Sequence, residues 1–472
     1  MLSSKVDTGG TDVVSGEIRY YIETFGCQMN QRDSETIAGL LETRGMKPAE
    51  NPREADVVVV NTCAVRQAAE RKVWSRLGEI AAMKPKGREP VIVLAGCMAQ
   101  LPETLERVKD KVPYVNVVTG PGQLDKIPRL VEEAMDAKTR GVAFQGPLVA
   151  VSPRRTEAER SESTQVLPEN LPRVKVPGVS AYVTIMYGCD NFCTYCIVPF
   201  VRGPQVSRDP RSVIDEVERL AQEGYKEVTL LGQNVNAYGH DLGGNYDFGD
   251  LLADLDKVPG LLRIRYATSH PRDFTPKMVD IIRDSEKVCE HFHLPVQSGS
   301  NRILKAMHRG YTRERYLELV EYIKSQIPGA SITTDIIVGF PGETEEDFHD
   351  TLDLVRQCRF DGAFTFIFSP RQGTAAAKME GQIPHEEKSR RLERLVEVQN
   401  SITRENNRRL LGKTVEILVE GPDEREPEHF RGRTRTNRMV ICTSGKAEPG
   451  QLVHVRIQEA GTWYLKGPMA QD

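Results

Sequence analysis

The sequence lacks any apolar run long enough to span a membrane. Its longest runs, such as VVVV at 57–60 and IIVGF at 336–340, are far shorter than the roughly 20 residues that a spanning helix needs. The first residues, MLSSKVDTGGTDVVSGE, do not place a charged segment before an apolar one, which argues against a secretory signal. We therefore expect a cytoplasmic protein with no membrane partner.

The sequence also lacks an excess of charge of either sign. Lys and Arg number 63 against 67 Asp and Glu, and the formal net charge is −4. Nucleic-acid binding therefore has no support from the overall composition and must rest on a local patch. The chain of 472 residues, 39% of them hydrophobic and 28% charged, fits a globular protein of two to four domains.

Strand and helix patterns alternate from residue 19 to residue 136. The strands are continuous apolar runs with helical segments between them, which predicts a parallel sheet with both faces covered. The first domain is therefore expected to be an α/β domain with a parallel sheet. Its predicted strands are 19–26, 55–62, 90–96 and 114–120.

The alternation stops at residues 137–175, where Pro, Ser and charged residues predict a linker, and residues 1–18 are expected to be a flexible N-terminus. A second alternating block over 176–406 has six predicted strands, which predicts a partial (β/α)6 barrel. Short alternating strands between Gly and Pro over 408–470 predict a small antiparallel β-barrel. The barrel strands are expected at 181–188, 226–232, 263–268, 292–296, 331–340 and 363–370.

Three of the nine cysteines lie within eight positions, in the segment YGCDNFCTYC at 187–196. Cys189, Cys193 and Cys196 follow the first predicted barrel strand, at the end where such folds place their chemistry. Iron–sulfur clusters need soft thiolates held close together, and three thiolates leave one iron of a [4Fe–4S] cluster open. A zinc site completed by a distant ligand, or a chance group of buried cysteines, are the alternatives.

Three further cysteines each follow a predicted strand directly. Cys27, Cys63 and Cys97 stand in TFGC, NTC and AGC. The carboxyl ends of parallel strands lie on one edge of a sheet, so these thiols can meet in a second three-cysteine site. The alternative is that cysteine is simply common at buried strand ends. The remaining cysteines are interpreted as ordinary core or surface residues: Cys289, Cys358 and Cys442.

The segment GCDNFCTYC resembles the signature of the radical S-adenosylmethionine (SAM) superfamily. The resemblance implies that the open iron chelates SAM, and that SAM is cleaved to a 5′-deoxyadenosyl radical that abstracts a hydrogen atom. Polar, glycine-bearing segments at the other strand ends also predict a mouth for a small polar cofactor. The SAM contacts implied are Tyr195 beside the adenine, Gln233, Gln297, Ser298 and Glu343, the last in DIIVGFPGE.

The segments FGCQMNQRDSE, NTCAVRQAAERK and AGCMAQ resemble the N-terminal domain of the methylthiotransferases, and the similarity extends over 19–470. It implies that Cys27, Cys63 and Cys97 hold a second [4Fe–4S] cluster, whose open iron carries the sulfur to be transferred. GCQMN resembles the MiaB type, which modifies tRNA. The resemblance implies methylthiolation of N6-(dimethylallyl)adenosine at position 37 of tRNA, with SAM as both methyl donor and radical source.

The same resemblance implies two further partners, an electron donor such as flavodoxin or ferredoxin and a sulfur source. Alternatives within the class are methylthiolation of threonylcarbamoyl-adenosine in tRNA or of a ribosomal protein aspartate. A metal-stabilised RNA-binding protein without turnover is the alternative from another class. No catalytic acid or base is assigned, because radical abstraction requires none, and the following histidines are interpreted as structural: His270, His291, His293 and His308.

The segment HFRGRTRTNR at 429–438 has four arginines and no acid. Arg431, Arg433 and Arg435 alternate, so on a strand they would share one face. A row of guanidinium groups suits a phosphate backbone, although an edge strand protected by charge is the alternative. The segment resembles part of the TRAM domain, an RNA-binding barrel, which implies that these arginines contact the tRNA.

Overall fold

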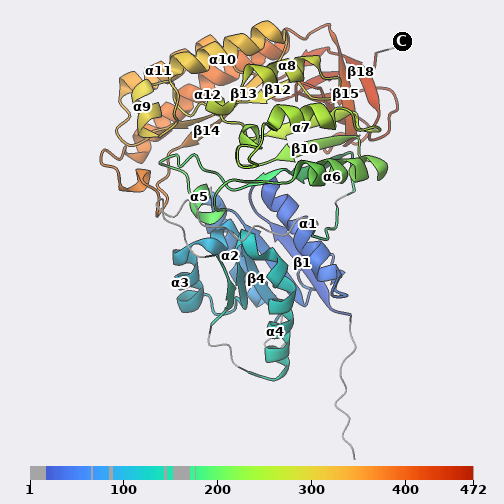
Figure 1. Ribbon diagram of the computed structural model, residues 1–472, viewed down its shortest axis with the longest axis vertical. Helices are drawn as coiled ribbons and strands as arrows, with labels where there is room; N and C mark the ends of the chain where they lie inside the picture. The colour runs from blue at the N-terminus through green and yellow to red at the C-terminus, as the bar shows by residue number, and fades with distance from the viewer. Residues whose placement is uncertain are drawn as a thin grey trace, which may run out of the picture.

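The computed structural model describes residues 17–64, 67–83, 89–142, 146–152, 171–175 and 177–470. Figure 1 shows the N-terminal domain below the barrel domain, with the C-terminal strands packed at one side of the barrel. The predicted flexible N-terminus lies outside the described residues except for residues 17 and 18. None of the helices in the part of the chain that the structure describes is long and apolar enough to cross a membrane.

The N-terminal domain is built on a parallel six-stranded sheet, as its continuous apolar strands predicted. The strand order is β2-β1-β3-β4-β5-β6, and buried apolar clusters cover both faces. The strands are β1 (Arg19–Thr24), β2 (Lys47–Pro48), β3 (Val57–Thr62), β4 (Val91–Gly96), β5 (Val117–Thr119) and β6 (Leu148–Ala150). The helices are α1 (Gln28–Glu42), α2 (Gln67–Ala82), α3 (Pro102–Lys111) and α4 (Ile127–Thr139).

The sheet extends into the segment that the sequence predicted as a linker. Helix α4 continues to Thr139, and β6 pairs in parallel with β5. The described residues 137–142 and 146–150 are therefore part of the N-terminal domain. Strand β6 has only three residues and lies among Pro, Ser and charged residues, so the composition of this segment predicted a linker instead.

The second domain is the predicted partial barrel of six parallel strands. Two three-stranded sheets, β11-β10-β7 and β12-β13-β14, are joined where Ile264 bridges Val288. Its strands are β7 (Ser180–Thr184), β10 (Glu227–Leu231), β11 (Arg263–Ala267), β12 (His291–His293), β13 (Ser331–Val338) and β14 (Gly362–Ile367). Its longer helices are α6 (Pro210–Gln222), α7 (Phe248–Leu255), α8 (Pro276–Asp284), α10 (Arg313–Gln326), α11 (Glu345–Cys358) and α12 (His385–Arg408).

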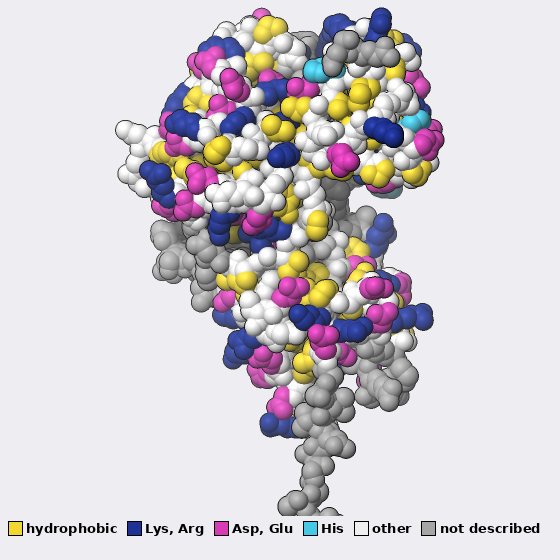
Figure 2. All heavy atoms as spheres, turned by 90° about the vertical axis from the view of Figure 1, so that its right-hand side faces the viewer, with side chains coloured by type: hydrophobic (Ala, Val, Ile, Leu, Met, Phe, Trp, Pro, Cys, Tyr) yellow, Lys and Arg dark blue, Asp and Glu magenta, His cyan; other side chains and the backbone are white. Residues whose placement is uncertain are grey.

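The C-terminal domain is a curled sheet in the order β18-β15-β16-β17-β20-β19. Its pairings are antiparallel except for β17 with β20, which run parallel. The strands are β15 (Thr414–Pro422), β16 (Phe430–Arg433), β17 (Met439–Cys442), β18 (Leu452–Arg456), β19 (Glu459–Ala460) and β20 (Leu465–Gly467). Figure 2 shows positive and negative side chains interspersed over one face of the molecule, in keeping with the balanced composition.

A buried ionic network holds the N-terminal domain against the barrel. Arg173 lies 2.9 Å from Glu216 of α6 and 3.5 Å from Glu35 of α1, and all three side chains are nearly buried. The backbone at Arg173 also lies against Gly39 of α1, where an added Cβ would come within 2.5 Å of the Arg173 Cα. Ion pairs this deeply buried depend strongly on geometry, so the network fixes the relative position of the two domains.

Candidate active site

The first group of thiols lies in the loop that follows β7 and the short strand β8 (Met186–Tyr187). The Cys196 N–H donates to the Cys193 carbonyl at 2.9 Å, which folds the loop tightly around the cysteines. Burial raises the pKa of Cys189 to about 11, and the neighbouring Cys193 adds to this. Burial, together with Cys193 and Cys189, also raises the pKa of Cys196. The structure therefore brings the three thiols into one electrostatic group.

A buried arginine supplies the positive charge beside this group. Arg309 donates from one nitrogen to the Cys193 sulfur at 3.2 Å and from another to the Pro295 carbonyl at 2.7 Å. The same guanidinium reaches the Tyr195 hydroxyl at 3.4 Å. Arg309 lies more than a hundred residues from the cysteines, so no local sequence pattern indicated it.

The second group of thiols lies at the carboxyl ends of three neighbouring strands. Cys27 caps α1 after β1, Cys63 follows β3, and Cys97 begins a short turn after β4. A hydrogen bond from Cys63, with help from the nearby Arg202, lowers the pKa of Cys27 to about 6. Because β1, β3 and β4 are adjacent in the sheet, parallel topology brings together cysteines that are far apart in sequence.

Glycines before two of these cysteines allow the close approach. Gly26 has φ +129°, and an added Cβ would lie 2.5 Å from the Cys63 Cβ. Gly96 has φ +91°, and an added Cβ would lie 2.4 Å from the Thr62 carbonyl oxygen. Both positions combine a backbone conformation and a steric limit that only glycine meets easily.

The donor sets of both groups fit an iron–sulfur cluster. Within the residues that the structure describes, no three Cys, His, Asp or Glu side chains surround the position of a single metal ion. The thiols of an iron–sulfur cluster need not surround a single point, because each thiolate binds a different iron atom of the cluster. Buried thiols also need a cationic partner to stay ionised, and cluster iron provides one. Three thiolates on each cluster would leave one iron of each without a protein ligand.

The residues expected to contact SAM lie in loops at the carboxyl ends of the barrel strands. Gln297 follows β12, and its non-glycine backbone has φ +72°, a strained conformation typical of functional sites. Ser298 is buried and lies 3.4 Å from Thr351, and Gln233 is half-buried directly after β10. Tyr195 lies beside Arg309. The structure thus gathers these side chains at one mouth, and their contact with SAM stays a prediction.

Polar atoms without partners also collect at this mouth. Four buried atoms after β10, β11 and β12 have no hydrogen-bond partner within the described part of the chain: Asn234 Oδ1, Ser269 Oγ, His270 Nε2 and Gln297 Oε1. Buried polar atoms are nearly always hydrogen-bonded, so these four are available to water or to a polar ligand. The mouth therefore fits a cofactor with amino, carboxylate and hydroxyl groups.

His270 is the titratable member of this set. Its Nδ1 accepts the Arg272 N–H at 3.3 Å, which leaves the proton on Nε2, the nitrogen without a partner. Burial, with Arg309 and Arg272 nearby, lowers the pKa of His270 to about 2. The side chain is therefore a neutral donor at the mouth. In the sequence His270 is an isolated histidine, which predicts a structural role, and nothing near it in the chain indicates these surroundings.

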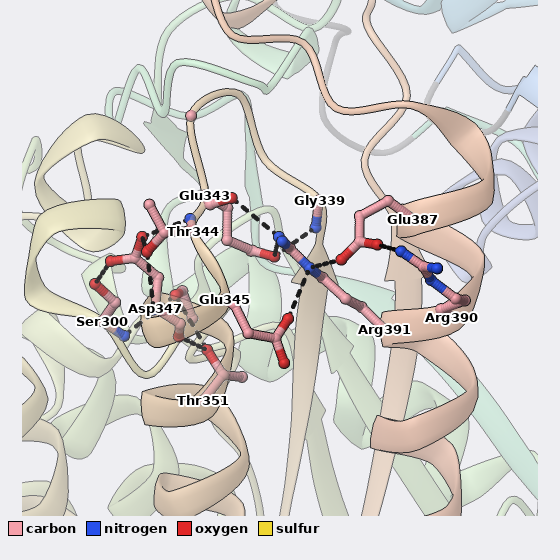
Figure 3. Close-up of polar contacts among 12 residues, drawn as sticks. Ser300, Gly339, Glu343, Thr344, Glu345, Asp347, Thr351, Glu387, Arg390 and Arg391 are labelled. Atoms are coloured by element: carbon pink, nitrogen blue, oxygen red, sulfur yellow. Dashed lines mark hydrogen bonds and ion pairs between the residues drawn. The ribbon is translucent and has the colours of Figure 1, made fainter.

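Glu343 has a supporting position in the loop after β13 (Figure 3). Its carboxylate accepts the Gly339 N–H at 3.0 Å and pairs with Arg391 of α12 at 2.7 Å. Both side chains of the pair are buried, and burial raises the pKa of Glu343. The carboxylate thus ties the glycine-rich loop to α12, and a direct contact with SAM stays a prediction.

Comparisons with known proteins support the three-part organisation. Residues 183–355 match the model of the Radical SAM superfamily, residues 19–120 that of the Uncharacterized protein family UPF0004, and residues 408–470 that of the TRAM domain. The chain is 51% identical to the tRNA-2-methylthio-N(6)-dimethylallyladenosine synthase of Moorella thermoacetica, over 97% of this chain and 99% of that one. The protein of the same name from Carboxydothermus hydrogenoformans is 49% identical, over 96% and 99%. The chain belongs to the radical SAM methylthiotransferase family.

This methylthiotransferase is accordingly an iron–sulfur enzyme that uses SAM and carries two [4Fe–4S] clusters. Its fold is similar to that of the radical SAM methyltransferase TsrM from Kitasatospora setae, with a TM-score of 0.53 at 16% identity. That similarity covers 77% of this chain and 74% of the other. At this identity it supports the fold alone.

The arginine row of the methylthiotransferase differs from the prediction in one residue. Arg431 and Arg433 lie on β16 and pair with Glu424 at 2.7 Å and Glu420 at 3.0 Å. Arg435 lies beyond the strand, where it pairs with Glu290 of the barrel and donates to the Val288 carbonyl at 2.7 Å. The expectation that all three share one strand face was therefore wrong for Arg435. The strand ends at Arg433 because the chain turns back there toward β17.

Proposed function

We propose that this chain methylthiolates N6-(dimethylallyl)adenosine at position 37 of tRNA. The observation that carries the proposal is the pair of cysteine groups, each at the carboxyl end of parallel strands in its own domain, in a chain with a TRAM domain. Relatives about half identical over nearly their full length carry the matching name. We assign Cys189, Cys193 and Cys196 to the first cluster.

Cys27, Cys63 and Cys97 are the ligands that we assign to the second cluster. When bound, the first cluster supplies the electron that cleaves SAM and the second presents the sulfur that is transferred. The chain itself positions the thiols on rigid strand ends and shields Cys63 and Cys97 from solvent, while Cys27 remains exposed. Because Cys27 is exposed and the other two ligands are buried, the substrate approaches the second cluster from the side of Cys27.

At the barrel mouth we assign SAM to the four unsatisfied polar atoms and their neighbours. His270 donates from Nε2, and Gln297 accepts through Oε1. The remaining assigned contacts are Tyr195, Gln233 and Ser298, with Glu343 holding the loop beside them. Satisfying these atoms compensates for the free energy lost when they were buried without partners.

The tRNA is proposed to contact the exposed face of β16 through Arg431 and Arg433. Both side chains are partly exposed, and their acidic partners can be exchanged for phosphates because surface ion pairs are weak. Reduction of the first cluster requires an electron donor such as flavodoxin or ferredoxin, and repeated turnover requires a sulfur source. Cytoplasmic tRNA is the expected substrate pool.

The decisive experiment is mass spectrometry of tRNA nucleosides from cells that lack this protein, with and without the gene restored. We expect 2-methylthio-N6-(dimethylallyl)adenosine to disappear and the unmodified dimethylallyl nucleoside to accumulate, with reversal on restoration. Loss of methylthiolated threonylcarbamoyl-adenosine instead would assign the protein to the other tRNA substrate. Unchanged tRNA together with loss of a methylthio group from a ribosomal protein would reject the proposal.

A further inference from the structure

A short helix joins the two cysteine groups. Helix α5 (Val198–Val201) begins two residues after Cys196 and packs against the other domain. Its Val201 forms a buried apolar cluster with Cys97 and Ala64. Figure 1 shows α5 at the junction between the barrel and the N-terminal domain. The chain that follows Cys196 of the first cysteine group therefore reaches Cys97 of the second group within one short helix.

The next residue, Arg202, reaches into the second group. Its Nε lies 3.1 Å from the Cys97 sulfur. One terminal nitrogen donates to Asn30 at 2.9 Å and to the Asp33 carboxylate at 2.8 Å, both on α1. The Arg202 and Asp33 side chains are each 5% exposed, so the barrel domain places a buried cation directly on a thiol of the N-terminal domain.

A second barrel arginine lies near the same group. Arg371, from the loop after β14, pairs with Glu70 of α2 at 3.4 Å and interacts electrostatically with Cys63. The N-terminal domain therefore contributes the thiols, whereas the barrel contributes cations beside them. A cluster with three thiolates is negative, and two of its three ligands here are buried, so the cations compensate for the solvation lost on that side.

We propose that Arg202 is a positioning residue of the second cluster, which donates a hydrogen bond to the cluster-bound Cys97 sulfur and raises the reduction potential of that cluster. Hydrogen bonds to the sulfurs and local charge are among the protein's main controls over cluster potential. Reduction adds one negative charge, and a cation with an N–H on the sulfur stabilises the reduced form more than the oxidised form. The second cluster is thus completed by both domains.

This proposal rests on the second cluster and not on which RNA is modified. The test is an anaerobic redox titration followed by electron paramagnetic resonance, without tRNA. It uses the full chain with Cys189, Cys193 and Cys196 replaced by Ala, so that the signal belongs to the second cluster. We expect Arg202→Gln to shift the midpoint potential to more negative values.

If Arg202 served only in folding, replacing Arg202 and replacing its acidic partner Asp33 would not shift the midpoint potential in opposite directions. Asp33 therefore provides the matched variant. Asp33→Asn removes a negative charge from the same network and should shift the potential to more positive values. Arg173→Gln breaks another contact between the two domains, with Glu35 and Glu216, and should leave the potential unchanged.

If Arg202→Gln loses the second cluster by iron analysis, Arg202→Lys carries the test. Lysine keeps the charge but not the Nε contact, so a smaller negative shift is expected. An unchanged midpoint potential in each Arg202 variant that retains the cluster would overturn the proposal. A shift of the same sign in Asp33→Asn and Arg202→Gln would overturn it as well.

Discussion

At the scale of residues, each cysteine group has a buried arginine on one sulfur: Arg309 lies 3.2 Å from the Cys193 sulfur and Arg202 lies 3.1 Å from the Cys97 sulfur. The six cysteines were identified because thiols are rare and each directly follows a strand or shares a short motif. Arg309 and Arg202 were not, because arginine is common and their partners are distant in sequence. His270 was interpreted as structural, because only its burial beside unsatisfied polar atoms distinguishes it from other isolated histidines.

The glycine before Cys27 gives the first prediction. Gly26→Ala forces a left-handed backbone on alanine, at a cost of about 1–3 kcal/mol, and its Cβ would overlap Cys63. We expect the variant to lose iron from the second cluster while retaining the first. Iron analysis after anaerobic reconstitution checks this, with Gly45→Ala as the control, since that glycine also has positive φ but open space around it. Full iron content in Gly26→Ala would contradict the steric argument.

The buried pair at the SAM loop gives the second prediction. Glu343→Ala leaves Arg391 buried without its nearest carboxylate, and removal of one partner of a buried pair costs about 3 kcal/mol or more. Glu345→Ala removes a half-exposed partner of Arg391 and Arg394 and should cost under about 1 kcal/mol. Thermal unfolding of both variants compares them directly. Equal melting temperatures would show that Glu343 does not support the loop.

At the scale of elements, most strands of the two larger domains were predicted, and the two edge strands of the N-terminal sheet, β2 and β6, were missed. The sheet of the N-terminal domain and the six barrel strands appear at the expected places because continuous apolar runs report burial on both faces. Strands β2 and β6 pair with one neighbour each, and they stand among Pro and charged residues that predict a loop or linker. The end of β16 at Arg433 was missed because alternation of arginines continues into the turn that follows.

The arginines of β16 and its turn give the third prediction. Arg431→Gln with Arg433→Gln should weaken tRNA binding and reduce the log–log salt slope by roughly one to two units, a little under one per phosphate contact. Arg435→Gln should leave the slope nearly unchanged but lower the melting temperature, because that side chain binds Glu290 of the barrel. Affinity measured over a salt series, alongside thermal unfolding, separates the two roles. A larger slope change for Arg435→Gln would reverse the assignment.

At the scale of the whole molecule, the fold brings two sites to the boundary between two domains. Composition and periodicity predicted the domain types, and the family resemblance predicted the chemistry. Neither could predict how the domains dock, because docking depends on single buried contacts such as Arg173 with Glu216. The apolar contact between Val201 of α5 and Cys97 is another single buried contact between the two domains.

The separation of the two sites gives the fourth prediction. Replacing Cys189, Cys193 and Cys196 by Ala should halve the iron from about eight to about four per chain and abolish SAM cleavage. The second cluster should persist because its ligands lie in another domain. Iron analysis and chromatography of 5′-deoxyadenosine check the two parts. Full iron content in this variant would contradict the assignment of a cluster to these cysteines.

Product analysis with the other cysteine group removed tests whether the second cluster provides the transferred sulfur. In reconstituted enzyme with SAM, reductant and tRNA bearing N6-(dimethylallyl)adenosine, Cys27, Cys63 and Cys97 are replaced by Ala and nucleosides are measured by mass spectrometry. We predict that the 2-methylthio product is lost while some 5′-deoxyadenosine still forms, because the barrel site remains intact. Formation of the 2-methylthio product at the wild-type rate would contradict the claim that the second cluster provides the sulfur.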